Sequence, residues 1–217
     1  MKAMILAAGH GERMRPLTDE IPKPLLEVHG RSLIEHQIEA IKQAGVTEFV
    51  INVAKMGNQI REKLGNGKER GISIIYSDEG NTPLETAGGI INALDNFTEP
   101  FLVTNADIFT DFPYQDLRQN IDEQAHLILV DNPAHHPEGD FVLNNNQVSR
   151  TAANKLTFSG IAIYRPELFA DYPPGVRPLA PILFDAADKG LVTGQHFSGY
   201  WNDVGTPERL HRINQKK

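Results

Sequence analysis

The side chains best suited to chemistry lie in a glycine-rich segment near the N-terminus. Gly9 and Gly11 follow a short apolar run, and glycine lets the backbone turn sharply and approach a ligand closely. Consecutive N–H groups in such a turn form a concavity that binds anions. Arg13, Arg15 and Lys23 follow within fifteen residues of Gly9 and can bind phosphate oxygens, Arg as a planar fork and Lys as a point charge. The segment therefore predicts a phosphate-binding loop.

This loop differs from the two best-known phosphate-binding motifs. It has neither the Gly-Lys-Ser/Thr of a Walker loop nor the third glycine of the dinucleotide fingerprint, which disfavours a dinucleotide-binding oxidoreductase. On two glycines alone, a surface turn with solvated arginines would be the better interpretation. The buried-type strand before Gly9 and the three cations after it favour phosphate binding instead.

Two aspartates far apart in the sequence are candidate metal ligands. Asp107 follows a buried-type strand at 101–105, and ligands of doubly wound sheets bind beyond the carboxyl ends of the strands. Mg²⁺ binds one or two carboxylates together with phosphate oxygens, so Asp107 suits an ion that bridges phosphates. The residue types alone leave Asp107 open to a turn-capping role, and they leave Asp203, close to Gly205, open to a surface turn.

The composition limits the classes of function. The chain has 217 residues, a net charge of −7 and no cysteine. Nucleic acid requires a basic surface, and without cysteine neither a disulfide framework nor a zinc–thiolate site can form. The apolar run at Met1 to Leu6 is too short for a signal peptide, and no apolar run approaches the length of about 20 residues that spans a membrane. We therefore expect a cytoplasmic protein without nucleic-acid or membrane partners.

The positions of the apolar residues predict alternating strands and helices in the first half of the chain. Ser32 followed by Glu35 forms a capping box before the first helix. The alternation predicts an α/β fold, a doubly wound, mostly parallel, Rossmann-like mixed sheet with helices on both faces. Strands are expected at 2–8, 48–53, 72–77 and 101–105, and helices at 33–44, 59–64 and 86–94.

The second half of the chain is less regular. Thr206 is a candidate N-cap for a last helix. No repeat or linker divides the chain, so we expect a single domain over residues 1–217. Strands are expected at 127–130, 140–143, 156–164 and 192–197, a helix at 181–189, and turns at 144–146 and 173–175.

The N-terminal loop resembles a family signature. Residues 9–18, Gly-x-Gly-x-Arg-Met-x-Pro-Leu-Thr, followed by Pro-Lys-Pro-Leu at 22–25, are similar to the signature of sugar-phosphate nucleotidyltransferases. The resemblance implies a Mg²⁺-dependent transfer of a nucleoside monophosphate from a nucleoside triphosphate to a sugar 1-phosphate, with release of pyrophosphate. It also implies that Arg13 and Lys23 are catalytic. Arg13 would hold the departing pyrophosphate, and Lys23 would hold the phosphates being joined.

The same resemblance implies the metal ligands and a division of the domain. Asp107, and Asp203 within Trp-x-Asp-x-Gly-Thr at 201–206, match the two Mg²⁺ ligands of the family. Residues 1–110 would form the nucleotide-binding half. Residues 111–217 would form the sugar-binding half and supply the second metal ligand.

Nucleotide contacts are expected from the loop and from residues 83–89, Pro-Leu-Glu-Thr-Ala-Gly-Gly, which resemble the base-binding loop of the family. Glu85 stands where many relatives have glycine, which leaves base contacts in this stretch open. Thr86 or Glu85 could instead cap a helix. The expected nucleotide-binding residues are Leu6, Ala7, Ala8, Gly9, Gly11, Glu79, Thr86 and Gly88.

Sugar contacts are less sharply marked. The Glu-Lys-Pro that many relatives carry before the next strand is replaced by Ala153-Asn154-Lys155, which leaves the recognition of sugar hydroxyls open. The adjacent His135 and His136 suggest a metal, but histidines in a loop are more often solvated or directed at a substrate. The expected sugar-binding residues are Asn105, Gly139, Asp140 and Ser159.

Further segments narrow the resemblance. Val-Asp-Asn-Pro-x-His-His at 130–136, Thr-Phe-Ser-Gly-Ile at 157–161 and Trp-x-Asp-Val-Gly-Thr at 201–206 are similar to N-acetylmuramate 1-phosphate uridylyltransferases of bacterial peptidoglycan recycling. This implies UTP and N-acetylmuramate 1-phosphate as substrates and a UDP-sugar as product, and we expect a monomer or a small homo-oligomer. A mannose 1-phosphate guanylyltransferase or another NDP-sugar pyrophosphorylase stays open. A phosphocholine-type cytidylyltransferase and a non-catalytic nucleotide-sugar-binding module are more distant alternatives.

Overall fold

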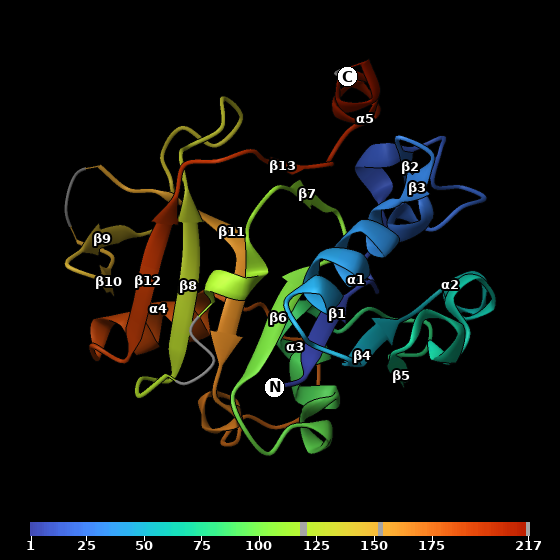
Figure 1. Cartoon of the computed structure of the whole chain (residues 1–217). Helices are drawn as coiled ribbons and strands as arrows, with labels where there is room; N and C mark the ends of the chain where they lie inside the picture. Colours follow the sequence, from blue (N-terminus) through green and yellow to red (C-terminus); the bar gives the residue numbers. More distant parts are fainter. Residues whose placement is uncertain (118–120, 152–153, 216–217) are drawn as a thin grey trace.

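A central sheet of nine strands organises the chain, and the computed structural model describes residues 1–117, 121–151 and 154–215. The strand order is β5-β4-β1-β6-β11-β8-β12-β10-β9 (Figure 1). The strands are β1 (Ala3–Leu6), β4 (Glu48–Val53), β5 (Ser73–Asp78), β6 (Phe101–Asn105), β8 (Ala125–Val130), β9 (Val142–Asn144), β10 (Gln147–Ser149), β11 (Thr157–Tyr164) and β12 (Val192–Phe197).

The strand directions make this sheet mixed and mostly parallel. β5, β4, β1 and β6 pair in parallel, β11 pairs antiparallel with both β6 and β8, and β12 pairs in parallel with β8. β8 and β12 therefore run in the same direction as the first four strands. This confirms the doubly wound, Rossmann-like fold class. The sheet draws strands from both of the predicted halves, and the division into halves stays a prediction.

Helices cover both faces of the sheet. They are α1 (Leu33–Gln43), α2 (Gly57–Leu64), α3 (Glu85–Asn92) and α4 (Ala180–Asp188), whereas α5 (Pro207–Gln215) packs away from the sheet in a separate small core with Leu26 and Val28. Ile38 of α1 and Ile60 of α2 belong to the core on one face, and Ile90 of α3 and Leu183 of α4 to the core on the other, behind the sheet in Figure 1. Among the described residues, no helix is long and apolar enough to cross a membrane.

Local signals set two helix boundaries as expected. In the capping box, Ser32 N donates to Glu35 Oε2 at 3.3 Å at the start of α1. At the start of α5, Arg209 N donates to Thr206 Oγ1 at 3.4 Å. Both predicted caps are therefore confirmed, and the second one fixes where the chain turns after Asp203.

Several short strands escape prediction from the sequence. β7 (Ile108–Thr110) pairs antiparallel with β13 (Trp201–Asp203), and β2 (Glu27–Val28) pairs with β3 (Arg31–Ser32). Runs of two or three residues are too short for an apolar alternation to reveal. The β7–β13 pair is functionally important because it joins the segment after Asp107 to the segment that contains Asp203.

The region around 140–149 differs from the expectation in its bounds. The strand expected at 140–143 is confirmed with shifted bounds: Phe141 forms an isolated bridge with Leu156, and β9 (Val142–Asn144) continues from it into a hairpin with β10. Asn145 and Asn146 form its turn with φ of 47° and 67°, a left-handed conformation that asparagine tolerates. The turn expected at 144–146 is thus confirmed, whereas Ala153 lies outside the described residues.

Candidate active site

The N-terminal loop leaves β1 and folds back on itself. Gly11 has a φ of 65°, in the left-handed region that favours glycine. A Cβ at this position would lie 2.9 Å from Thr18 Cγ2 and 3.2 Å from Lys23 Cβ, so a larger side chain would displace both. Thr18 Oγ1 closes the loop by donating a 2.8 Å hydrogen bond to Gly11 O. Steric crowding therefore explains why residue 11 is glycine, and the absence of a side chain there allows Lys23 to lie beside the loop.

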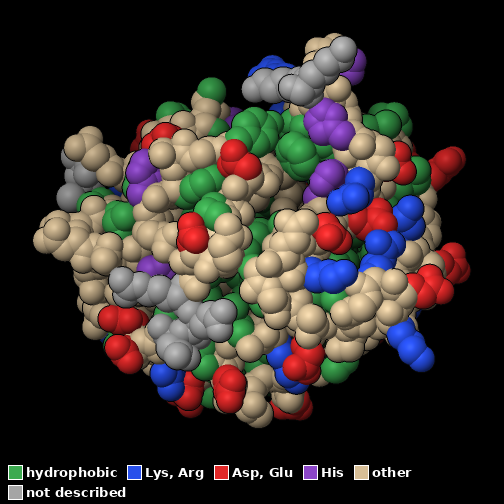
Figure 2. Space-filling view, in the orientation of Figure 1, with side chains coloured by type: hydrophobic (Ala, Val, Ile, Leu, Met, Phe, Trp, Pro, Cys, Tyr) green, Lys and Arg blue, Asp and Glu red, His purple; other side chains and the backbone are tan. Residues whose placement is uncertain are grey.

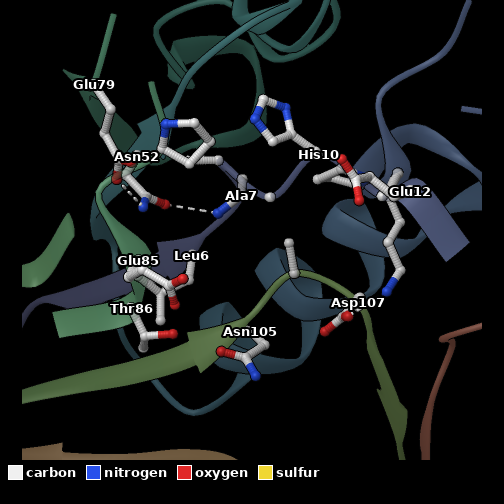
Figure 3. Close-up of a pocket in the computed structure, with 17 residues that line it drawn as sticks. Leu6, Ala7, His10, Glu12, Asn52, Glu79, Glu85, Thr86, Asn105 and Asp107 are labelled. Atoms are coloured by element: carbon white, nitrogen blue, oxygen red, sulfur yellow. Dashed lines mark hydrogen bonds and ion pairs between the residues drawn. The ribbon is translucent and has the colours of Figure 1, made fainter. Parts of the chain in front are cut away.

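Asn52 and Glu79 tie together the ends of β1, β4 and β5. The Ala7 N–H donates to Asn52 Oδ1 at 2.6 Å, and Asn52 Nδ2 donates to Glu79 Oε1 at 2.6 Å (Figure 3). Glu79 Oε2 accepts the Leu84 N–H at 2.8 Å, so the chain itself engages both carboxylate oxygens of Glu79. Asn52 was not predicted, although a polar residue inside a buried strand is a usable signal because buried polar groups need partners.

A cavity of about 500 Å³ opens at the carboxyl ends of β1 and β6. This is where ligands bind in doubly wound sheets. Lys23 and Asp107 line this cavity together with most of the residues predicted to bind the nucleotide, which are Leu6, Ala7, Ala8, Gly9, Gly11, Glu79 and Thr86.

A second cavity, of about 640 Å³, adjoins the first. Arg13 and Asp203 line it, together with the predicted sugar-binding residues Asn105, Asp140 and Ser159. Leu6, Glu85, Thr86, Asn105 and Asp107 belong to the linings of both cavities. Because Asp107 lines both, ligands that occupied the two cavities would meet at this carboxylate.

Gly88, predicted to bind the nucleotide, and Gly139, predicted to bind the sugar, line neither cavity. A Cβ at Gly88 would lie 2.3 Å from Gly175 O, and a Cβ at Gly139 would lie 2.7 Å from Asn132 Oδ1. Both glycines therefore permit close packing of the chain, and the ligand contacts expected for them stay predictions. Glu85, which does line both cavities, has a φ of 63°, a conformation that glycine adopts more readily.

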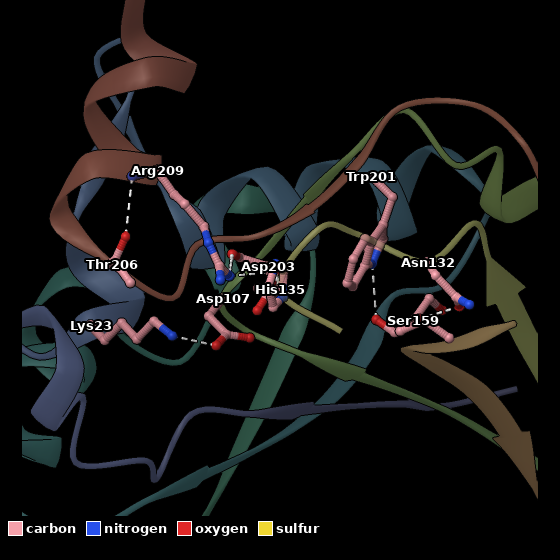
Figure 4. Close-up of polar contacts among 10 residues, drawn as sticks. Lys23, Asp107, Asn132, His135, Ser159, Trp201, Asp203, Thr206 and Arg209 are labelled. Atoms are coloured by element: carbon pink, nitrogen blue, oxygen red, sulfur yellow. Dashed lines mark hydrogen bonds and ion pairs between the residues drawn. The ribbon is translucent and has the colours of Figure 1, made fainter. Parts of the chain in front are cut away.

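The backbone brings Asp107 and Asp203 together, and basic side chains engage both carboxylates. The Val204 N–H donates to Asp107 O at 2.9 Å, next to the β7–β13 pair. Lys23 Nζ lies 2.5 Å from Asp107 Oδ2 (Figure 4). Arg209 Nη1 lies 2.7 Å from Asp203 Oδ1, and His135 Nε2 lies 3.3 Å from the same oxygen. The carboxylates of two distant segments thus lie among basic side chains from the loop, from α5 and from the segment after β8.

This donor set suits a divalent metal that is completed by substrate. No group of three or more His, Asp or Glu side chains in the described part of the chain could hold a metal ion by itself. Mg²⁺ usually takes only one or two carboxylates and fills its shell with phosphate oxygens and water. Two adjacent carboxylates at the junction of two cavities therefore fit Mg²⁺ better than a metal enclosed by protein ligands.

A buried polar network supports the turn that holds Asp107. Gln37 of α1 donates from Nε2 to Ile108 O at 2.7 Å. Burial raises the pKa of Tyr114 well above its usual value, so its hydroxyl stays protonated and donates to Gln37 Oε1 at 2.5 Å. Gln37 was not predicted as a functional residue, because its fixed position relative to Ile108 arises only from the tertiary fold.

Gln37→Leu is expected to lower the free energy of unfolding by about 1–2 kcal/mol, since it leaves the Tyr114 hydroxyl and the Ile108 carbonyl buried without their partner. Urea denaturation measures this loss. The double variant Gln37→Leu/Tyr114→Phe should recover part of the stability, because it also removes a hydroxyl that would keep only its 3.3 Å contact with Thr104 Oγ1. If the single variant were as stable as the parent protein, the network would have no role in holding the turn.

The far wall of the second cavity is built from the segment after β8 and from β11. Asp140 Oδ1 accepts from His136 Nε2 at 3.0 Å, and Asp140 Oδ2 accepts the Phe158 N–H at 2.8 Å. Trp201 Nε1 donates to Ser159 O at 3.0 Å (Figure 4). Asp140 therefore orients His136 at the cavity, and Trp201, which also lines it, is held against β11.

Charges of both signs are mixed on the face of the molecule that carries α1 and α2. Figure 2 shows Lys and Arg side chains interleaved with Asp and Glu side chains over these helices. Glu35 of α1 lies 2.7 Å from Arg70 and 3.9 Å from Lys63. This face therefore resembles an ordinary charged surface rather than the continuous basic patch that nucleic acid requires.

Fold and site together define a class of enzyme. A glycine-rich loop lines the first of two adjoining cavities, Asp107 lines both and Asp203 lines the second, at the carboxyl end of a doubly wound sheet. Such a site suits the transfer of a nucleotidyl group between two phosphorylated ligands. The model of the nucleotidyl transferase family matches residues 2–141, and the chain belongs to the sugar-phosphate nucleotidyltransferases, as its loop signature predicted.

Individual relatives agree with this family. The chain is 50% identical to N-acetylmuramate alpha-1-phosphate uridylyltransferase of Neisseria meningitidis serogroup B, over 97% of this chain and 95% of that protein. It is 30% identical to mannose-1-phosphate guanyltransferase beta-A of Xenopus laevis, but spans only 62% of that protein's length. Among solved structures, a putative glucose-1-phosphate thymidylyltransferase from Bacillus anthracis superimposes with a TM-score of 0.85 at 26% identity, covering 99% of this chain and 94% of that one.

Proposed function

We propose that this enzyme transfers the uridylyl group of UTP to N-acetylmuramate 1-phosphate, forming a UDP-sugar for peptidoglycan recycling. An oxygen of the sugar phosphate attacks the α-phosphorus of UTP, the bond from that phosphorus to the β-phosphate oxygen breaks, and pyrophosphate leaves. The main structural support is Asp107, which lines both cavities, so that a nucleotide in one and a sugar phosphate in the other meet there. The identity of 50% over almost the whole chain supports this choice of substrates.

The chain's own residues act by positioning two anions that repel each other. In this proposal Lys23 neutralises the phosphates being joined, and Arg13, which lines the second cavity with Asp203, stabilises the departing pyrophosphate. The nucleophile is already an anion, so catalysis depends on orientation and on charge stabilisation rather than on proton transfer. Mg²⁺, held by Asp107 and Asp203, would supply further positive charge to the phosphate oxygens of both substrates.

The histidines of the second cavity favour an acidic sugar as acceptor. N-acetylmuramate carries a carboxylate on its lactyl group, which mannose lacks. The cavity is lined by His135 and His136, whose ring N–H groups can donate to such a carboxylate, and Asp140 holds His136 Nε2 at 3.0 Å. UTP and sugar phosphates are metabolites of the cytoplasm, where we place the reaction, and the expectation of a monomer or small homo-oligomer stays a prediction.

Pyrophosphate release across a matrix of substrates tests this function. UTP, GTP, CTP and dTTP are each combined with N-acetylmuramate, N-acetylglucosamine, glucose and mannose 1-phosphates in the presence of Mg²⁺. The highest kcat/KM is expected for UTP with N-acetylmuramate 1-phosphate, because only this sugar offers a carboxylate to the histidines. Turnover confined to GTP and mannose 1-phosphate would overturn the proposed substrates.

A further inference from the structure

Arg209 is a cation beside Asp203 for which the reaction as proposed has no role. Its side chain is 17% exposed. Its Nη1 donates twice to one residue, to the carboxylate oxygen Asp203 Oδ1 at 2.7 Å and to the main-chain oxygen Asp203 O at 3.0 Å (Figure 4). The guanidinium therefore holds both the backbone and the side chain of Asp203.

The position of Arg209 in its helix indicates a purpose other than helix stability. Arg209 lies in the first turn of α5, where the positive end of the helix dipole disfavours a cation by about 0.3–1 kcal/mol. A Cβ at Gly205 would lie 3.0 Å from Arg209 Nη1 and 3.4 Å from Asp203 Oδ2. The unfavourable position of Arg209 and the glycine at 205 are both explained if the guanidinium must reach Asp203, because a side chain at 205 would occupy the space of the guanidinium.

In each of the two carboxylates, basic side chains engage one oxygen and leave the other without a contact among the described residues. Lys23 takes Asp107 Oδ2, and Arg209 and His135 take Asp203 Oδ1. Within the described residues, no hydrogen bond or ion pair reaches Asp107 Oδ1 or Asp203 Oδ2. A carboxylate fixed through one oxygen presents the other in a defined direction, as partners of metal ligands commonly arrange.

We propose that Arg209 is a positioning residue that fixes Asp203 so that its second oxygen is available to the divalent metal. His135 assists from the segment after β8 by holding the same oxygen, Oδ1. The inference rests on the proposed function only in taking Asp203 as a metal ligand. It does not depend on which base or which sugar the enzyme accepts.

Binding of Mn²⁺ in the presence of UTP tests the proposal without any turnover. Free Mn²⁺ is measured by electron paramagnetic resonance, and quenching of Trp201, the only tryptophan of the sequence and two residues from Asp203, reports binding at the site. Arg209→Met is expected to weaken Mn²⁺ binding by about 10–100-fold, the usual effect of losing a partner of a metal ligand. Arg209→Lys should restore part of the affinity, and excess Mg²⁺ should restore much of the kcat of Arg209→Met.

Arg212→Met is the matched control, because it removes an exposed cation from the same helix and should leave Mn²⁺ affinity unchanged. A melting temperature for each variant separates misfolding from weakened binding. Unchanged or tighter Mn²⁺ binding in a folded Arg209→Met protein overturns the proposal. So does unchanged Mn²⁺ binding with a raised KM for UTP, which would make Arg209 a phosphate contact. If the parent enzyme prefers another substrate pair, the proposed function fails but the proposal for Arg209 does not. The same Mn²⁺ titration, repeated with the preferred nucleotide, then tests Arg209.

Discussion

Lys23→Met should reduce the rate of UDP-sugar formation by about 10²–10³-fold, the loss observed when one preorganised group that stabilises charge in a transition state is removed. The Lys23 side chain is only 11% exposed, so water screens its charge poorly and the loss falls at the upper end for a single cation. Steady-state kinetics at saturating UTP and sugar 1-phosphate measure the effect on kcat. Lys68→Met, at an exposed lysine away from both cavities, is the control and should turn over normally.

The ion pair of Lys23 with Asp107 makes the interpretation of this variant testable in a second way. Lys23 Nζ lies 2.5 Å from Asp107 Oδ2, so Lys23→Met also leaves a half-buried carboxylate without its cation. If both residues act on the same pair of phosphates, Asp107→Asn slows the reaction comparably, and the double variant is little slower than either single one. Near-normal turnover of a folded Lys23→Met protein would contradict the catalytic assignment.

The parts of the site that could be predicted from sequence are those that belong to one local segment. Gly11 and Lys23 lie in one loop after one strand, and Asp107 follows a strand whose end must face the ligand side of a doubly wound sheet. Their spacing along the chain was therefore enough to mark where they lie, whereas the roles of Lys23 and Asp107 came from the family resemblance and stay predictions. Asp203 depended on the family resemblance, because its approach to Asp107 is created by the β7–β13 pair, whose strands are too short to be read from a pattern.

The parts that could not be predicted are contacts between distant segments. Asn52 bridges Ala7 and Glu79 from a neighbouring strand, and Arg209 reaches Asp203 from a helix that the sequence marks only by its cap. Gly88 was expected to contact the base because residues 83–89 resemble the base-binding loop of the family, and that contact stays a prediction. The carbonyl of Gly175 approaches the Cβ position of Gly88, a contact between distant segments that nothing in the local sequence marks.

Alanine substitutions at Gly88 and Gly89, which are neighbours in α3, should affect different properties: the first stability and the second nucleotide binding. Alanine in place of glycine within a helix normally adds about 1 kcal/mol of stability. At Gly88 the new Cβ would lie 2.3 Å from Gly175 O, a backbone atom that cannot rotate away. Gly88→Ala must therefore part α3 from the segment whose Arg177 O accepts the Ala87 and Gly88 N–H groups. We expect a net loss of about 1–3 kcal/mol, as in other overpacked sites, measured by urea denaturation.

Gly89→Ala meets different atoms and should have a different effect. Its Cβ would lie 2.5 Å from Glu79 Oε1 and 2.7 Å from Asn52 Nδ2, the ends of side chains that can move. Moving them breaks the bridge that holds the Ala7 N–H at the floor of the first cavity. The protein should therefore keep most of its stability while the KM for UTP rises and the KM for the sugar phosphate changes less. A variant in which the sugar phosphate alone bound more weakly would contradict the assignment of the first cavity to the nucleotide, because Asn52 and Glu79 line only that cavity.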